Sequence, residues 1–448
     1  MAVIIPKRLG LSIAGDVRRS DATHCPESCS LAARSRSRRC ARVSAGSRPR
    51  APLIALAARQ IGVPVKWIED RREHLLASSS GTDRVAHREL AAAKDGTVLA
   101  MRYRWLDNVG GYVRSPEPGC SFRPTGNFVG PYRFQHLEVD TAVVMTNKSL
   151  TGPNRGYACG HLYFETERMM DLLAQRLGLD PVEVRRRNLI QPGQFPYRTP
   201  TGGLYDSGDY PAALERAVEI ARYAELRREQ AAARAAGRLF GIGVALAVDP
   251  SVSNMGYVAT ALDPQFRAKP EYLPKSGAVD GATIRVDPLG RVTAILATTP
   301  QGQGHQTVVS QIVADELGLT PADVTVVDEM DTLTRFWSIS SGTYSSRFGS
   351  VGTSAVALAA RKLKAKLIDY AAHLMEIPAD QLEFRAGSVR QKSGKGASYS
   401  VKDLAGRAHW NTTSLPEGME PGLQASAVFG FTVAQPVDEN DCVNSSAM

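Results

Sequence analysis

A short glycine-rich segment between a predicted strand and a predicted helix constrains this chain more than any other feature. It runs from Thr299 to Thr307 and reads Thr-Pro-Gln-Gly-Gln-Gly-His-Gln-Thr, between a β-rich run (291–298) and an amphipathic run (308–317). A strand that passes through glycines into a helix exposes unpaired backbone N–H groups, and the helix dipole adds partial positive charge there. The pattern fits either a binding turn for a phosphate or pyrophosphate or an ordinary tight turn. Its spacing matches neither a P-loop nor a Rossmann fingerprint.

The basic character of the chain belongs to its first fifty residues. The net charge is +9, and residues 1–50 account for +8 of it with 11 Lys and Arg against 3 Asp and Glu. The rest is nearly neutral, so we expect no general nucleic-acid-binding surface. The Arg/Ser-rich stretch 34–42 predicts a disordered or out-of-frame segment over 1–51. A basic nucleic-acid-binding arm and a transit-like presequence are the alternatives.

Composition predicts a globular protein of the cytoplasm. The chain is 43% hydrophobic and 22% charged. No apolar run approaches the roughly 20 residues that span a bilayer, and we expect no secretory signal because the N-terminus lacks an apolar core. The six cysteines have no zinc or iron–sulfur spacing, which favours a reducing compartment and no metal ligands from the protein.

The pattern of elements predicts an α+β fold with mixed sheets, because strands and helices alternate too irregularly for a doubly wound fold. Hairpins are expected over 88–113, turning at Asp95-Gly96, and over 282–297, turning at 287–290. A buried strand is expected at 63–68, and helices at 53–61, 165–177, 213–238 and 353–375.

One local pattern recurs. The stretches QRLGLDPVEV (175–184) and DELGLTPADV (315–324) share a glycine followed by a capping-box helix start, at Asp180 and Thr320, with a weaker echo at 377–380. We interpret this as one structural unit that is used more than once.

Two further segments could hold charged groups. The stretch 340–347 reads Ser-Ser-Gly-Thr-Tyr-Ser-Ser-Arg before a long helix and fits either a second anion site or an ordinary helix-start loop. Arg155 stands among small residues, where its guanidinium could reach a planar or oxyanionic substrate or bridge backbone carbonyls. His305 is interpreted as an orienting hydrogen-bond donor or a satisfied polar residue. Cys159 and His161 lack the partners of a metal site.

Five segments, in order, resemble the large, molybdopterin-binding subunit of the xanthine dehydrogenase/aldehyde oxidase family, which includes the aerobic carbon monoxide dehydrogenases. They are VPVKWIEDRREHLL (63–76), PNRGYACGH (153–161), ERMMDLLAQRLGLDPVEVRRRNLI (167–190), PQGQGH (300–305) and GTYSSR (342–347). The resemblance implies two mixed α/β molybdenum-cofactor-binding domains, both incomplete, over 52–235 and 236–448, after the basic segment 1–51.

The resemblance also implies a molybdenum hydroxylase that oxidises an aldehyde or an N-heterocycle with water as the oxygen source. The cofactor would be molybdopterin, in the cytosine dinucleotide form usual in bacterial members. Its dithiolene holds the molybdenum, so no protein side chain needs to ligate the metal. Electrons would pass to partner subunits that carry 2Fe-2S and FAD.

Family site residues carry over position by position. Arg155 matches the substrate-orienting arginine. The first cofactor loop matches at Gln301, Gly302, Gln303, Gly304 and His305, and the second at Gly342, Thr343, Ser345, Ser346 and Arg347. Carbon monoxide oxidisers have a copper-binding cysteine directly after the loop arginine. Here Gly156 stands at that position and Cys159 comes three residues later, so carbon monoxide is not the expected substrate.

The chain also departs from the family. The family's Gly-Gly-Gly-Phe-Gly type of cofactor segment would lie over 20–50, and its Gly-x-Gly-Glu motif, which supplies the general base, would follow Met448. We therefore expect this chain to lack the base, the N-terminal hammerhead domain and part of the cofactor cage. The alternative function is an inactive fragment with a partial cofactor- or subunit-binding surface, and a third is a nucleic-acid binder on an unrelated scaffold.

Overall fold

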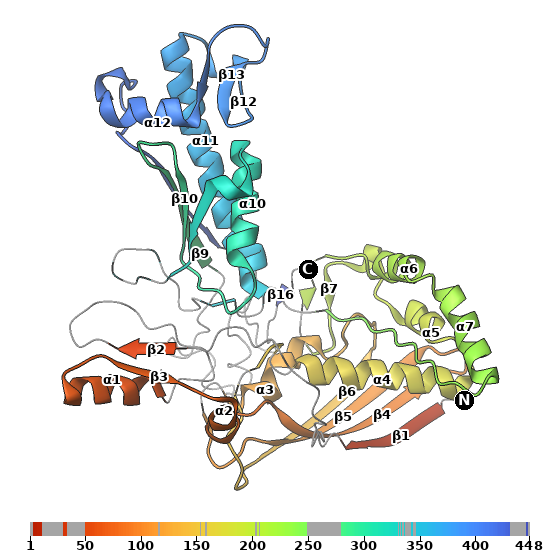
Figure 1. Cartoon of the computed structure of the whole chain (residues 1–448). Helices are drawn as coiled ribbons and strands as arrows, with labels where there is room; N and C mark the ends of the chain where they lie inside the picture. The colour runs from red at the N-terminus through yellow and green to blue at the C-terminus, as the bar shows by residue number, and fades with distance from the viewer. Residues whose placement is uncertain are drawn as a thin grey trace, which may run out of the picture. The chain divides into compact units, whose positions relative to one another are not determined.

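The computed structural model divides into two compact units, each of which is described by itself (Figure 1). The first comprises Met1–Pro250, Gly256–Pro274 and Gln435–Met448, and the second comprises Ser251–Met255 and Lys275–Ala434. The structure describes residues 3–10, 30–33, 50–114, 117–152, 154–156, 159–201, 204–205, 207–248, 279–329, 331, 333, 336, 342–343, 346–430 and 445–446. No helix in these ranges is long and apolar enough to cross a membrane. The predicted domain boundary at 235 stays a prediction.

The first unit is built on a four-stranded sheet in the order β1-β4-β5-β6, with helix α4 (Cys159–Leu177) lying along one face (Figure 1). The strands are β1 (Val3–Gly10), β4 (Asp83–Ala92), β5 (Val98–Asn108) and β6 (His136–Val144), and only the β5–β6 pair is parallel. The predicted hairpin at Asp95-Gly96 is confirmed as β4–β5. Gly96 takes a φ of 90° in its turn, which a glycine adopts at little cost.

The remaining elements of the first unit are short or peripheral. They are β2 (Ser30–Ala33), α1 (Arg50–Ile61), β3 (Val65–Ile68), α2 (Arg71–Ala77), α3 (Gly119–Phe122), α5 (Pro181–Asn188), β7 (Tyr197–Arg198), β8 (Leu204–Tyr205), α6 (Tyr210–Ile220), α7 (Tyr223–Ala235) and β16 (Ser445–Ser446). Strands β1 and β2 lie within the segment for which the sequence predicts disorder.

Two predictions about this unit are wrong. Strand β3 is not buried: among the described residues it pairs with β2, and its Ile68 is 54% exposed. The single helix expected over 213–238 is two helices, α6 and α7, because Arg222 between them takes a left-handed φ of 49°.

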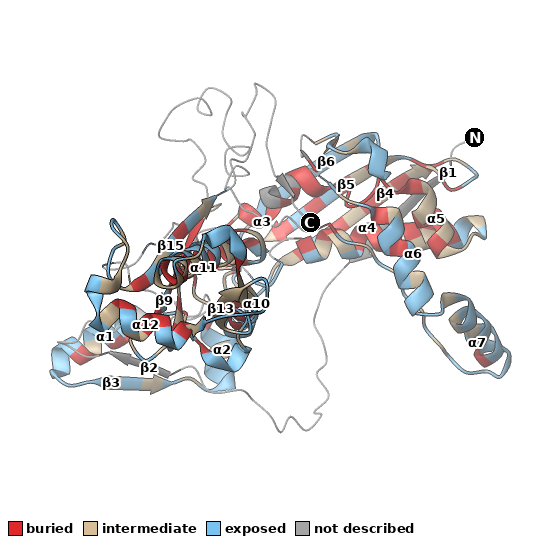
Figure 2. Ribbon diagram, turned by 90° about the horizontal axis from the view of Figure 1, so that it is seen from above, coloured by how far each residue is buried: buried red, intermediate tan, exposed pale blue. Residues whose placement is uncertain are grey.

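The core of the first unit lies between the sheet and α4 (Figure 2). Alternate residues of β5 point inward, among them Met101, Tyr103 and Trp105, all of which are buried. Met169 and Leu173 meet them from α4 at the four-residue spacing of one helix face.

The second unit has a sheet in the order β11-β10-β9-β15. Its strands are β9 (Val279–Val286), β10 (Val292–Leu296), β11 (Val324–Val327) and β15 (Leu423–Gly430). Helices α10 (His305–Leu317) and α11 (Thr353–Met375) pack on it and share its hydrophobic core (Figure 1). A second sheet, β12 (Leu382–Arg385), β13 (Ser388–Gln391) and β14 (Ser398–Ser400), leads into α12 (Val401–Trp410). The predicted β9–β10 hairpin and the predicted helix over 353–375 are both confirmed.

The recurring sequence pattern corresponds to a shared way of ending a helix. Helices α4, α10 and α11 each end at a residue with positive φ: Gly178, Gly318 and Glu376. The amide two residues past each helix bonds back five residues, as in Leu319 N to Ala314 O at 2.9 Å. A full helix follows only the first of these ends, whereas single 3₁₀ turns follow the other two. The repeat is therefore a local motif and not a repeated larger unit.

Replacing Glu376 with glycine should stabilise the second unit by about 0.5–1 kcal/mol, because Glu376 holds a φ of 55° at a place where the other two helices have glycine. The matched change is Gly318→Ala. It should destabilise, because a Cβ there would lie 2.8 Å from the Ala386 amide nitrogen. Urea unfolding followed by the helical circular dichroism signal would measure both. Equal shifts of the two midpoints would contradict this account.

Candidate cofactor-binding site

The glycine-rich segment leads directly into helix α10 and leaves its first amides open. Gly302 and Gly304 have φ values of 95° and 74°, which explains glycine at both positions. Gly304 is the N-cap residue, no side chain caps the helix, and the first helical bond runs from Val308 N to Gly304 O at 3.1 Å. Residues 301–304 are exposed, and a Cβ on either glycine would meet no atom within 4 Å. The helix start therefore offers backbone donors beside open space.

The second predicted loop lies against this helix start. The Thr343 hydroxyl and His305 Nε2 share a hydrogen bond of 2.8 Å, although 38 residues separate them. The Arg347 guanidinium reaches Thr298, which directly precedes the glycine-rich segment, at 3.0 Å. The structure thus brings His305 together with Thr343 and the loop that ends at Arg347. Ser345 lies outside the described residues, so its predicted contact is not located.

His305 is held between the two loops. It is the first residue of α10, is buried, and stacks on the Phe348 ring with centroids 3.6 Å apart and planes 14° apart. Burial lowers the pKa of His305, and the opposing effects of Asp328, the Thr298 backbone and Asp280 are smaller. The imidazole is therefore neutral near pH 7.

The second unit should lose stability as the pH falls below 6.5, the ordinary pKa of histidine. In that range the unfolded chain takes up a proton that folded His305 resists, so the stabilisation is complete above 6.5 and is lost on acidification. His305→Gln should flatten this dependence. Hydrogen exchange in α10 and α11, compared at pH 7.5 and 5.5, would test it, and an unchanged pH dependence in the variant would contradict it.

Arg347 faces the protein interior. Its guanidinium is fully buried and donates from Nη1 to Thr298 Oγ1 (3.0 Å) and the Gly342 carbonyl (3.2 Å). Nη2 donates to the Val279 carbonyl (2.5 Å) and pairs with Asp280 Oδ2 (3.3 Å). Burial lowers the pKa of Arg347 and Asp280 opposes the shift. The predicted contact of Arg347 with a cofactor stays a prediction beside these internal bonds.

The backbone on either side of Arg347 is irregular. Ser346 is exposed and takes a left-handed φ of 51°, and Phe348–Gly352 form a π-helical turn before α11. Both conformations are uncommon and recur at functional sites. The sequence reasoning missed Asp280, Thr298 and Phe348 as members of this cluster. The one available signal was Asp280, an acidic residue inside an apolar strand.

Arg155 lies in the first unit, in a turn before α4. Its side chain is exposed, and its amide donates to Asn154 Oδ1 at 2.8 Å. Within the part of the chain that the structure describes, its guanidinium makes no hydrogen bond or ion pair. The alternative in which it bridges backbone carbonyls therefore has no support among these residues. The following Gly156 has a φ of 76°, which a cysteine would adopt only with strain.

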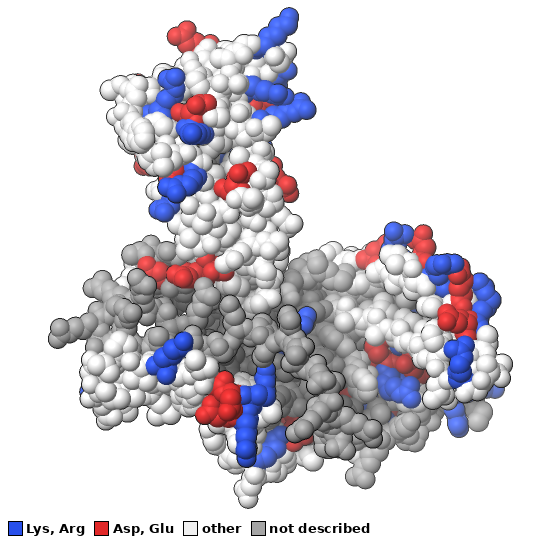
Figure 3. All heavy atoms as spheres, in the orientation of Figure 1, with Lys and Arg blue, Asp and Glu red and all other residues white. Residues whose placement is uncertain are grey.

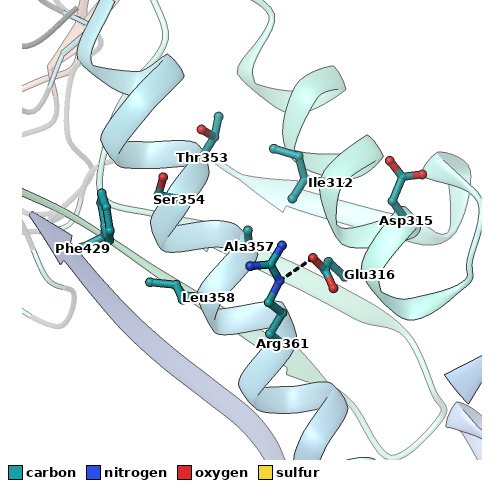
Figure 4. A pocket seen from close by; sticks show the side chains of 9 residues that line it. All are labelled: Ile312, Asp315, Glu316, Thr353, Ser354, Ala357, Leu358, Arg361 and Phe429. Atoms are coloured by element: carbon teal, nitrogen blue, oxygen red, sulfur yellow. Dashed lines mark hydrogen bonds and ion pairs between the residues drawn. The ribbon is translucent and has the colours of Figure 1, made fainter. Parts of the chain in front are cut away.

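A hollow of about 470 Å³ lies elsewhere in the second unit, along helices α10 and α11 (Figure 4). The Arg361–Glu316 ion pair (2.7 Å) crosses it, and Phe429 of β15 lines it. None of the predicted site residues is among its lining residues. In the described ranges no group of three or more His, Cys, Asp or Glu could hold a metal ion.

Charges of both signs mix on the visible surface of α6 and α7 (Figure 3). Arg186 pairs with Glu215, Arg216 with Glu219, and Arg222 with Glu225. The basic stretch 34–42 lies outside the described residues. A nucleic-acid-binding face requires a cluster of positive charge. The surface over these two helices carries both signs and does not meet that requirement.

Known proteins resemble this chain over most of its length. Two family models, each described as a molybdopterin cofactor-binding domain, match residues 45–189 and 216–446. The carbon monoxide dehydrogenase large chain of Afipia carboxidovorans is 37% identical over 385 residues, which cover 82% of this chain and 44% of that relative. The nicotine 6-hydroxylase large subunit of Paenarthrobacter nicotinovorans is 30% identical over 382 residues, covering 84% and 44%.

A solved structure gives the same result for the fold. Quinoline 2-oxidoreductase from Pseudomonas putida 86 superimposes with a TM-score of 0.73 at 27% identity, over 87% of this chain and 48% of that one. The chain thus spans less than half the length of these relatives. The predicted family and fold class are confirmed. This chain belongs to the molybdopterin cofactor-binding family, and it is similar to the carbon monoxide dehydrogenase large chain and to the nicotine 6-hydroxylase large subunit.

Proposed function

We propose that this chain binds molybdopterin in its cytosine dinucleotide form, with cofactor-binding domains over 52–235 and 236–448. One observation carries the proposal: the His305–Thr343 bond holds the glycine-rich segment and the second loop at one helix start. The residues present fit an anionic tail, because the amides that open α10 are uncapped and the glycines beside them leave room.

The proposed reaction is the hydroxylation of an aldehyde or N-heterocycle with water as the oxygen source. When bound, the cofactor would supply the metal that accepts two electrons and transfers the oxygen. The chain's own residues bind and orient. The loop amides hold the anionic tail, neutral His305 fixes Thr343, and Arg155 directs its exposed guanidinium to the substrate. Partner subunits with FAD and 2Fe-2S would take the electrons.

The class of substrate follows from Gly156 and from the relatives. Carbon monoxide oxidisers have a copper-binding cysteine directly after the loop arginine. In this chain Gly156 follows Arg155 instead. Two of the relatives are named for nicotine and quinoline. We therefore favour an N-heterocycle or an aldehyde over carbon monoxide.

A second candidate is a chain that binds the cofactor or a partner subunit without turnover. Expression of the full chain in a host that makes the cytosine dinucleotide separates the two. Molybdenum and released cytidine monophosphate, each near one per chain, with dye-linked oxidation of an aldehyde or N-heterocycle support the first. Bound cofactor without turnover would support the second candidate. A chain that carries neither molybdenum nor nucleotide would contradict cofactor binding.

Arg155→Ala is expected to leave the molybdenum content unchanged and to lower kcat/KM by roughly 10- to 100-fold, the loss of one charged hydrogen bond to substrate. Arg155→Lys should recover part of the rate, since it keeps the charge without the planar fork. Arg216→Ala, at an exposed arginine of the same unit, serves as the control. An Arg155→Ala enzyme with normal kcat/KM would remove the residue from the site.

A further inference from the structure

A buried pair of opposite charges, Asp280 and Arg347, lies behind the two loops of the proposed site. We propose that these two residues form a positioning pair that sets the separation of the loops, and that Arg347 acts from the interior without contacting the bound anion. The expected effect of the pair on cofactor binding rests on the proposed function. Its effect on the positions of the two loops rests only on the geometry of the second unit.

Arg347 ties the second loop to the sheet at several points. The carbonyl of Val279 and the carboxylate of Asp280 belong to β9, and Thr298 is the second residue after β10. Strands β9 and β10 are antiparallel neighbours in one sheet, so these anchors are rigid relative to one another. Among the described residues, the Gly342 carbonyl at the start of the loop itself is a further anchor. One guanidinium therefore joins the loop to β9 and to the segment that follows β10.

Both carboxylate oxygens of Asp280 have bonding partners, as the Arg347 guanidinium does. Its Oδ1 accepts from the Gly281 amide at 2.9 Å, and its Oδ2 accepts from the Thr298 hydroxyl while it faces Arg347. Asp280 is 1% exposed and Arg347 is 0% exposed. A buried charge without its counter-charge is strongly unfavourable. Each residue therefore holds the other in place, and a rotamer of Arg347 that reached outward would leave Asp280 unpaired.

The pair acts on the helix start through Phe348. This residue follows Arg347 directly and stacks on His305, whose ring also bonds Thr343. The second loop is thus fixed at its beginning, by Gly342 and Thr343, and at its end, by Arg347 and Phe348. Exposed Ser346, held at positive φ, lies between these points. A shift of Arg347 would move Phe348 and with it the first residue of α10, where the open amides are.

The test uses the full chain and three variants: Asp280→Asn, Arg347→Lys and the double variant. Hydrogen exchange without any ligand should rise about tenfold or more at 308–310 and 353–356 in each single variant, as a buried charged bond is lost. The double variant leaves a buried lysine without a counter-charge, just as Asp280→Asn leaves the arginine, so its exchange should be no faster than that of Asp280→Asn alone. Asp287→Asn, in the exposed β9–β10 turn, is the control and should change neither stretch.

Binding of cytidine 5′-diphosphate, measured by calorimetry, supplies the second readout. We expect both single variants to bind about tenfold more weakly, even though Asp280→Asn removes a negative charge. If Arg347 contacted the phosphates directly, Asp280→Asn would leave binding equal or tighter, and Arg347→Lys alone would weaken it. That pattern overturns the inference.

The two readouts also separate this inference from the proposed function. If the unmodified chain fails to bind cytidine 5′-diphosphate while exchange rises in both variants, the positioning pair stands and the cofactor assignment falls. If folded Asp280→Asn exchanges like the unmodified chain, the pair is overturned whatever binds. Should Asp280→Asn fail to fold, Thr298→Val carries the test, because it removes one bond from each partner and no charge.

Discussion

Replacing Arg185 with methionine is expected to lower the free energy of unfolding of the first unit by about 3–5 kcal/mol. The side chain is fully buried, and Nε donates to Glu167 Oε2 at 2.8 Å. Nη2 donates to the Glu167 carbonyl and Nη1 to the Pro181 carbonyl, both at 3.1 Å. Methionine would fill similar space, but it would leave the buried Glu167 carboxylate with the Tyr132 hydroxyl and without a counter-charge beside it. The loss of that charge compensation, more than lost packing, causes the expected effect.

The next residue provides the control. Arg186 pairs with Glu183 and Glu215 on the surface, and its side chain is 41% exposed. Arg186→Met should therefore cost under about 1 kcal/mol. Urea unfolding followed by hydrogen exchange in α4 peptides reports on this unit separately. Similar losses for the two variants would show that the burial of Arg185 does not govern its contribution.

This pair of neighbours shows where sequence reasoning ends. Arg185, Arg186 and Arg187 are three identical residues in a row. The orientation in which α5 packs on α4 decides which of them is buried. Asp180 was predictable as the N-cap, because its short acidic side chain precedes a proline, and it does accept from Val182 N at 2.8 Å. The reciprocal capping bond from Glu183 was predicted and is not formed. Glu183 pairs with Arg186 and Arg187 instead.

The same distinction holds in the second unit. The glycine-rich turn, the β9–β10 hairpin and the bounds of α11 follow from local periodicity and turn chemistry, so the sequence predicts them. The pairing of Asp280 with Arg347 joins residues 67 positions apart by sequence number, and no local pattern encodes it. The exposure of β3 was not predicted for a related reason: an apolar run does not show whether another element packs on it.

Gly352→Ala is expected to destabilise the second unit by about 1–3 kcal/mol and to weaken cofactor binding. A Cβ at this position would lie 2.3 Å from the Phe348 ring and 3.1 Å from Asp280 Oδ2. Both neighbours are buried, so neither can move aside without disturbing the cluster. Displacement of the Phe348 ring would separate it from His305, and displacement of the carboxylate would loosen Arg347. One methyl group would therefore act on the Phe348–His305 stack, which holds the second loop against α10, and on the Asp280–Arg347 pair, which holds the loop to the sheet.

The π-helical turn contains its own control. Gly349 lies in the same turn, and a Cβ there would meet no atom within 4 Å. Gly349→Ala should change the free energy of unfolding by less than about 0.5 kcal/mol and leave cytidine 5′-diphosphate binding unchanged. Thermal unfolding and calorimetry of both variants, with the molybdenum content of chains made in a cofactor-producing host, would test the contrast. If the two alanines behaved alike, the close packing of Phe348 and Asp280 against Gly352 could not be what keeps the two loops together.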